Sequence, residues 1–241
     1  MKRVLSIGRW VWAAWAVLLL LSTGCMKGGE MTDSKSLPDY SFSDVGESLA
    51  IGTVRVREEK WYIRLDERTA GYVANQSEVR GIADGTRVFL QFRYVLGYMP
   101  DFCTDAILVE WVSPIEVGEV GRSLPSEAAL SESLSGDPLS IVTDWITSLE
   151  DGFLTLHYSF PTKGKARHGF KLIPLDGPGE YYLLHDAHGD TEGELSEGII
   201  CFPVAEILPA TDGETVRLTL VYYDIEKNTE KTLTFECRNP E

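Results

Sequence analysis

Residues 87–94 read Arg-Val-Phe-Leu-Gln-Phe-Arg-Tyr, an alternation in which every second side chain is apolar. Neighbouring side chains of a β-strand point to opposite faces, so one face of this segment would carry Val88, Leu90, Phe92 and Tyr94. The same period recurs in residues 60–66, Lys-Trp-Tyr-Ile-Arg-Leu-Asp. Half-buried strands of this kind predict antiparallel sheets and an all-β fold.

Three further runs of strand-forming residues complete the first part of the chain, at residues 49–57, 70–74 and 107–117. Five strands are the number in an oligonucleotide/oligosaccharide-binding (OB) barrel, although the count by itself also fits other small barrels. We therefore assign residues 46–120 to an OB-like β-barrel domain.

Turn-forming residues gather in residues 118–138, around one short segment with helical character. We assign residues 121–138 to a linker with a short helix. Seven further strands are predicted at residues 139–149, 153–160, 169–174, 181–185, 198–203, 215–224 and 231–237. Their number and spacing favour an antiparallel β-sandwich over residues 139–241.

The chain begins with a basic and then apolar leader. Three basic residues precede an uncharged apolar run over residues 10–21, which is too short to span a bilayer as a helix, since that takes about 20 residues. Residues 21–25, Leu-Ser-Thr-Gly-Cys, resemble the lipobox of bacterial lipoproteins, with the leucine one place earlier than usual. The resemblance implies a signal peptide at residues 1–24 and a diacylglycerol on Cys25. The alternative is a cleaved secretory signal with a coincidental cysteine.

Residues 25–45 have no apolar period and are expected to form a lipidated, flexible tether. Two or three acyl chains hold a protein stably, so the mature chain is expected to be attached to a membrane through lipid on Cys25. Met26 follows the cysteine, where an aspartate would suggest inner-membrane retention by analogy with enteric lipoproteins. We therefore expect the outer membrane, on either its periplasmic face or the cell surface.

Without residues 1–24 the chain has 217 residues, and its formal charge changes from −15 to −18 because three basic residues are removed. Nucleic acids are bound mainly through Lys and Arg, so a chain this acidic is not expected to bind them. The excess is concentrated in residues 123–241, which contain 8 basic and 21 acidic side chains.

Several short motifs, taken in order, resemble the NigD-like lipoproteins of Bacteroidetes. They are Gly-Thr-Arg-Val at 85–88, Gly-Asp-Pro-Leu at 136–139, Asp-Trp-Ile at 144–146, Asp-Gly-Phe-Leu-Thr-Leu at 151–156, His-Asp-Ala-His-Gly-Asp at 185–190 and the predicted hairpin at 216–235. The resemblance covers nearly the whole mature chain and implies an OB-like domain followed by a β-sandwich. The family is named for an association with bacteriocin loci, which implies an immunity-like role.

Three potential metal ligands, His185, His188 and Asp190, lie within six residues. Imidazole and carboxylate groups would suit zinc. In a strand, however, positions 185 and 188 point to opposite faces, so the two rings converge only if the chain turns between them, as Gly189 permits. We expect instead that Asp190 holds turn amides and that these residues bind no metal.

No other motif indicates catalysis. The chain has no nucleophile elbow, no glycine-rich phosphate loop before a helix and no His-Glu-x-x-His. His157 and His168 indicate no site by themselves. We expect no enzymatic activity and no cofactor.

Beyond Cys25 the chain has three cysteines. Cys103 lies in a predicted turn and is expected to be an exposed thiol. A bridge between Cys201 and Cys237 is left open, because sequence does not supply their distance.

Arginines and aromatic residues alternate on the polar strand faces of the first domain. The set is Arg55, Arg57, Tyr62, Arg64, Arg87, Phe89 and Arg93. Such a set would suit a carboxylated glycan or an acidic protein. The alternative is a solvated outer face, whose arginines prevent edge pairing and stack over the aromatic rings.

We therefore predict a cell-envelope lipoprotein with a non-catalytic binding or interaction role, for which the resemblance implies bacteriocin immunity. Its partner is the membrane, through lipid, together with an unidentified protein or glycan. A second hypothesis is a surface glycan-binding accessory lipoprotein, which needs an exposed aromatic platform. A third is a metal-dependent hydrolase built around His185 and His188.

Overall fold

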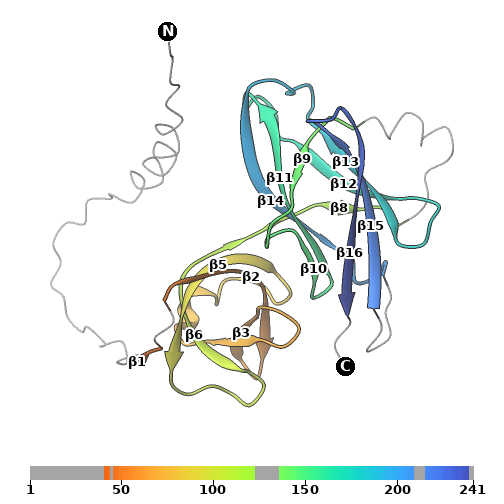
Figure 1. The fold of residues 1–241 in the computed structure, drawn as a ribbon. Coiled ribbons are helices and arrows are strands. Elements are labelled where there is room, and N and C mark those ends of the chain that lie inside the picture. Colours follow the sequence, from red (N-terminus) through yellow and green to blue (C-terminus); the bar gives the residue numbers. More distant parts are fainter. Residues whose placement is uncertain (1–40, 44–45, 123–135, 209–214, 239–241) are drawn as a thin grey trace, which may run out of the picture. The chain divides into compact units, whose positions relative to one another are not determined.

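The structure is a computed structural model that describes residues 41–43, 46–122, 136–208 and 215–238 (Figure 1). The predicted signal peptide, Cys25 and nearly all of the predicted tether at residues 25–45 lie outside the described residues, as does most of the predicted linker at 121–138. In these ranges no helix is long and apolar enough to cross a membrane.

The first domain is a closed barrel of five strands: β2 (Ser48–Arg57), β3 (Lys60–Arg64), β4 (Ala70–Val73), β5 (Arg87–Leu96) and β6 (Asp105–Pro114). Strands β4 and β6 pair in parallel, whereas β2 pairs antiparallel with β3 and β5, and β5 closes the barrel against β6. The short strand β1 (Ser41–Phe42) adds to β5, and a 3₁₀ turn, η1 (Gln76–Glu78), follows β4. The predicted five-stranded barrel is confirmed.

Alternation along the strands produces the barrel core, as the sequence predicts. Val88, Leu90 and Phe92 of β5 are buried together with Ile63 of β3. The opposite face of β5 is not uniformly solvated, however, because Arg87 is only 1% exposed.

The second domain is a β-sandwich of two five-stranded sheets (Figure 1). One sheet contains β7 (Glu116–Val117), β9 (Ser140–Val142), β10 (Ser148–Glu150), β11 (Phe153–Thr162) and β14 (Glu194–Pro203). The other contains β8 (Glu119–Val120), β12 (Gly169–Pro174), β13 (Glu180–Asp186), β15 (Thr215–Asp224) and β16 (Thr229–Arg238). The sandwich and the all-β class are confirmed, but β7–β14, β8–β12 and β13–β15 pair in parallel.

The sandwich core contains apolar side chains from both sheets, including Leu156, Leu172, Phe202 and Leu220, all fully buried. The chain passes from one sheet to the other at Gly118, between β7 and β8. A Cβ at this position would lie 2.1 Å from the Phe202 ring, so only glycine fits. The first strands of the second domain, β7 and β8, thus precede the predicted linker at residues 121–138.

One predicted strand, residues 139–149, is wrong as a single element. It is divided into β9 and β10 by a turn in which Asp144 Oδ1 accepts a hydrogen bond from the Ile146 amide at 3.0 Å. Aspartate competes with strand pairing in this way because its short side chain reaches the backbone two residues on. A tight turn joins β10 and β11 as a hairpin, with Asp151 and Gly152 both at positive φ.

Candidate functional site

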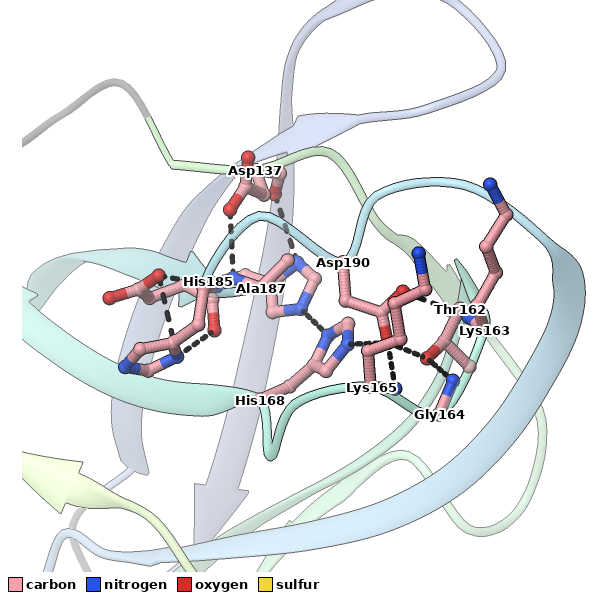
Figure 2. Close-up of polar contacts among 11 residues, drawn as sticks. Asp137, Thr162, Lys163, Gly164, Lys165, His168, His185, Ala187 and Asp190 are labelled. Carbon is pink, nitrogen blue, oxygen red and sulfur yellow. Dashed lines mark hydrogen bonds and ion pairs between the residues drawn. The ribbon is translucent and has the colours of Figure 1, made fainter.

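Three of the titratable side chains of the sandwich form a buried group that we call the polar cluster: His168, His185 and Asp190 (Figure 2). His168 immediately precedes β12, His185 lies in β13, and Asp190 lies in the loop that follows β13. His168 Nδ1 and His185 Nε2 are 2.8 Å apart, and His168 Nε2 lies 3.9 Å from Asp190 Oδ2. The hairpin of β12 and β13 brings the two rings together.

The segment around Asp137 fixes the orientation of His185. His185 Nδ1 lies 3.1 Å from the Asp137 carbonyl oxygen, which only accepts hydrogen bonds, so Nδ1 carries the proton. In the neutral ring Nε2 then accepts from His168 Nδ1. The Asp137 carboxylate accepts the Ala187 amide at 2.7 Å, so both nitrogens of His185 and its neighbouring backbone are occupied.

Asp190 holds the loop that follows β11. Its carboxylate accepts hydrogen bonds from the amides of Lys163 and Lys165, at 2.9 and 2.7 Å, and from the Thr162 hydroxyl at 2.8 Å. The Lys163 amide is the leading cause that holds the pKa of Asp190 well below its usual range, against the opposing effect of burial. Asp190 is thus ionised, and both of its carboxylate oxygens accept hydrogen bonds from the loop.

Aromatic rings enclose the two histidines. The His168 ring stacks on Phe160 at 4.0 Å, and the His185 ring stacks on Phe170 at 5.0 Å. His185 is 2% exposed, and this burial lowers its pKa to about 4. At neutral pH His185 is therefore an uncharged ring packed against the sandwich core.

The structure does not bring His188 to His185. His188 is exposed at a positive φ of 50°, and its Nδ1 lies 3.3 Å from the Asp186 carbonyl oxygen. The ring that does meet His185 is that of His168, which the sequence did not single out. In the part of the chain that the structure describes, no group of three or more His, Cys, Asp and Glu side chains is arranged to hold a metal ion.

The predicted arginine and aromatic set separates into three groups. The first faces the turn between β10 and β11. Arg55 lies 3.0 Å from the Asp151 carboxylate and Arg64 lies 3.4 Å from it. The buried Arg87 contacts Thr53 Oγ1 at 3.1 Å and Glu150 Oε2 at 3.4 Å. These three cations are used in contacts within the compact unit that begins at residue 40.

The second group is also engaged within the protein. Phe89 packs edge-on against Trp111 and lies 6.1 Å from Trp145. Arg93 forms ion pairs with Glu47 and Glu110.

The third group, Arg57 and Tyr62, lies beside an open hollow of about 470 Å³ on the barrel. The hollow lies between the β2–β3 turn and the loop that joins β5 to β6. Its lining residues are Arg57, Glu58, Lys60, Tyr98, Met99, Pro100, Asp101 and Phe102. We call this feature the barrel hollow.

Two aromatic rings, Tyr98 and Phe102, line the barrel hollow, and each contacts a tyrosine ring of the sheet. Tyr62 of β3 and Tyr72 of β4 are directly opposite each other in the sheet. Phe102 lies 5.3 Å from Tyr62, and Tyr98 lies 6.0 Å from Tyr72. Tyr98 is 68% exposed. The rings form a row that continues from the sheet into the loop.

Two cations accompany this aromatic row. The Arg57 guanidinium lies over Phe102, 4.9 Å from the ring centroid. Lys60 Nζ donates a hydrogen bond to the Tyr98 hydroxyl at 3.0 Å, and this bond raises the pKa of Lys60. Among the described residues neither cation has a carboxylate within ion-pair distance.

Hydrogen bonds of Cys103 and Thr104 hold the β5–β6 loop in place. The Cys103 amide donates to the Pro100 carbonyl at 3.0 Å, and Thr104 Oγ1 accepts the Ala70 amide at 3.0 Å. Cys103 is 6% exposed, so the predicted exposed thiol is wrong. Burial raises the pKa of the Cys103 thiol to about 11.

Lys60, Tyr98 and Phe102 are not among the binding residues predicted from the sequence. A signal for them is nevertheless present, because residues 97–102, Gly-Tyr-Met-Pro-Asp-Phe, place three large apolar side chains in a turn region. A turn has no buried strand face to receive such side chains, so aromatic residues there indicate a recognition surface.

Comparisons with known proteins agree with this architecture. Residues 123–237 match the family model of the NigD-like C-terminal beta sandwich domain. Among curated proteins, none matches the chain. A solved structure of a protein named as toxin-related, from Parabacteroides distasonis, is similar over 81% of this chain and 95% of its own, at 23% identity and a TM-score of 0.63.

Two other solved structures are similar over 81% of this chain. A NigD-like immunity protein from Bacteroides caccae is covered over 99% of its length, at 18% identity and a TM-score of 0.55. A protein named as a lipoprotein, from Bacteroides fragilis, is covered over 100% of its length, at 13% identity and a TM-score of 0.56. At these identities the similarities show the fold.

Proposed function

We propose that this chain is a lipid-anchored cell-envelope protein of the NigD-like kind with a non-catalytic binding role, because residues 123–237 match the NigD-like C-terminal beta sandwich domain. The observation that carries this proposal is the barrel hollow, in which the exposed Tyr98 ring is held on the β5–β6 loop beside Arg57 and Lys60. Among the described residues these two cations have no carboxylate within ion-pair distance. Groups in this state are available to a ligand, whereas the polar cluster is occupied by contacts within the protein.

The proposed anchor is lipid on Cys25, and the proposed location is the outer membrane. Support comes from the leader sequence and from the name of the similar Bacteroides fragilis protein. Labelling cells with a fatty acid should mark the wild-type chain in the membrane fraction and leave Cys25→Ala unlabelled. Cys103→Ala is a matched control that should keep the label. Equal labelling of the wild type and Cys25→Ala would contradict the anchor.

The proposed biological role is protection against a bacteriocin, in line with the name of the similar Bacteroides caccae protein. Cells that lack the gene should be killed at lower bacteriocin concentration than the parent strain, and the wild-type gene should restore resistance. Tyr98→Ala should restore less resistance than Trp145→Ala, since only Tyr98 lines the barrel hollow. Equal sensitivity of the parent and the deletion strain to every bacteriocin of neighbouring strains would contradict this role.

A surface glycan-binding role is the second candidate, and it requires an exposed aromatic platform. Tyr98, which lines the barrel hollow, is a large aromatic residue with 68% of its surface exposed. This observation favours the second candidate over the hydrolase hypothesis, for which His185 and His188 would have to converge.

A further inference from the structure

We propose that the barrel hollow and its aromatic row bind a short, uncharged carbohydrate chain. The inference rests on the proposed binding role and names the chemistry of the ligand. In OB barrels the face of the second and third strands, with the loops that join strands one to two and four to five, receives oligosaccharides or oligonucleotides. Here those elements are β3, β4, the β2–β3 turn and the β5–β6 loop. The turn, the loop and the start of β3 line the barrel hollow, and Tyr72 of β4 contacts the lining residue Tyr98.

The shape and the aromatic content suit a sugar. The volume of about 470 Å³ lies within the range of roughly 300 to 1,000 Å³ that small-molecule sites occupy. Tyr98 presents most of its ring to solvent, next to half-buried rings of Tyr62, Tyr72 and Phe102. Flat aromatic faces provide large, rigid contact area at little entropic cost, and the C–H face of a pyranose ring matches them.

The polar groups suit hydroxyls more than ions. Half of the eight lining residues are charged, and Arg57 and Lys60 are balanced by Glu58 and Asp101. This set supplies donors and acceptors side by side with no net charge, as a hydroxyl requires because it both donates and accepts. A phosphate chain would meet the two carboxylates and the overall charge of the acidic protein, so a nucleic acid is disfavoured.

The β2–β3 turn provides an independent observation. Glu58 and Glu59 both have positive φ, at 54° and 59°. Two-residue hairpins of this geometry prefer Asn-Gly or Asp-Gly, because side chains other than those of glycine and asparagine are strained there. The chain places a glutamate at the edge of the hollow despite the strain. Strained backbone of this kind concentrates at ligand sites, which fits a role for the Glu58 carboxylate in recognition.

The test is a binding measurement on the purified full-length mature chain. An array of neutral, uronate-containing and sulfated oligosaccharides selects the probe, and calorimetry then measures Kd. We expect a neutral oligosaccharide to bind, and Tyr98→Ala or Arg57→Ala to raise its Kd by about tenfold or more, as at other aromatic and arginine contact centres. Tyr98→Phe should keep most of the affinity, because it retains the ring.

Matched controls lie elsewhere on the protein. Trp145→Ala removes an exposed aromatic ring, and Arg80→Ala removes an exposed arginine that lies over Trp61. Both should leave Kd within about twofold. Thermal unfolding of every variant checks that the fold is intact. Tyr98→Leu, which removes the aromatic ring, and Arg57→Gln, which removes the charge, replace any variant that fails to fold.

The outcomes separate the inference from the proposed function. Binding of no oligosaccharide on the array, or binding that Trp145→Ala abolishes and Tyr98→Ala leaves unchanged, overturns the inference. Tighter binding of a single-stranded oligonucleotide or a proline-rich peptide overturns the ligand class while leaving a binding role. Envelope location and bacteriocin protection are measured in cells, and failure of either would contradict the proposed function. Sugar binding is measured on the purified protein, so that result stands independently of the cellular ones.

Discussion

The polar cluster of the sandwich and the barrel hollow both combine titratable side chains with aromatic rings, yet they differ in how the polar groups are paired. In the polar cluster the rings are buried and nearly every polar atom has a partner, with His168 Nε2 as the exception. In the barrel hollow the Tyr98 ring is exposed, and two cations have no carboxylate within ion-pair distance in the part of the chain that the structure describes. Burial with internal hydrogen bonds indicates a structural role, whereas exposure on a fixed loop indicates recognition.

The largest expected effect removes a buried ring from the polar cluster. His185→Ala should lower the free energy of unfolding by about 3 to 4 kcal/mol, because it leaves a cavity beside Phe170 and removes the partner of His168. Urea denaturation measures this difference. The exposed His188→Ala is the matched control and should change stability by less than about 0.5 kcal/mol. Similar losses in the two variants would contradict the distinction drawn between these histidines.

Acid should destabilise the polar cluster next most strongly. The pKa of His185 is about 4 in the folded protein and about 6.5 when unfolded, so the unfolded state binds the extra proton between these values. The contribution of His185 to the free energy of unfolding is therefore fully present above about pH 6.5. It is lost as the pH decreases towards 4, which lowers the free energy of unfolding by up to about 3 kcal/mol.

Urea denaturation across this pH range tests the effect. His185→Gln should flatten the pH dependence between 4 and 6.5, and His188→Gln should leave it unchanged. Asp190 makes stability fall with acid as well, but at lower pH. Its lowered pKa stabilises the folded protein at pH values above the usual aspartate pKa, and this stabilisation is lost as the carboxylate is protonated. A pH slope that survives in His185→Gln would assign the effect to another group.

The two hairpin turns offer a smaller contrast. Gly152 in the β10–β11 turn has a φ of 78°, and a Cβ there would lie 2.9 Å from Ala205 Cβ. Gly152→Ala should therefore destabilise the protein by about 1 to 2 kcal/mol. Glu59→Gly should stabilise it by about 1 kcal/mol, because glycine relieves the strain of the β2–β3 turn. Thermal unfolding measures both, and a loss of stability in Glu59→Gly would show that the turn is not strained.

The smallest expected effect on stability is that of a substitution in the barrel hollow. Tyr98→Ala should change the free energy of unfolding by less than about 0.5 kcal/mol, because the ring is mostly exposed and its hydrogen bond to Lys60 lies at the surface. Denaturation of the variant beside Tyr98→Phe measures this. A loss of 2 kcal/mol or more would mean that Tyr98 supports the barrel and is not held there for a ligand.

Much of the fold follows from local pattern. Alternating side chains in residues 60–66 and 87–94 predict strands whose apolar faces, including Ile63 and Leu90, are indeed buried. The division of residues 139–149 could not be predicted, because period-2 alternation does not show that Asp144 turns the chain. The same limit applies to Arg87, whose place on a polar face predicts solvent although Thr53 and Glu150 enclose it.

By itself the sequence determined the all-β class, the acidic charge and the resemblance to NigD-like proteins, since these depend on composition and on neighbours along the chain. Only the tertiary structure decided that His168, and not His188, meets His185, because the register of β12 and β13 sets that contact. The barrel hollow likewise joins rings from β3, β4 and the loop after β5. Long-range strand pairing determines such neighbours, and no local period encodes it.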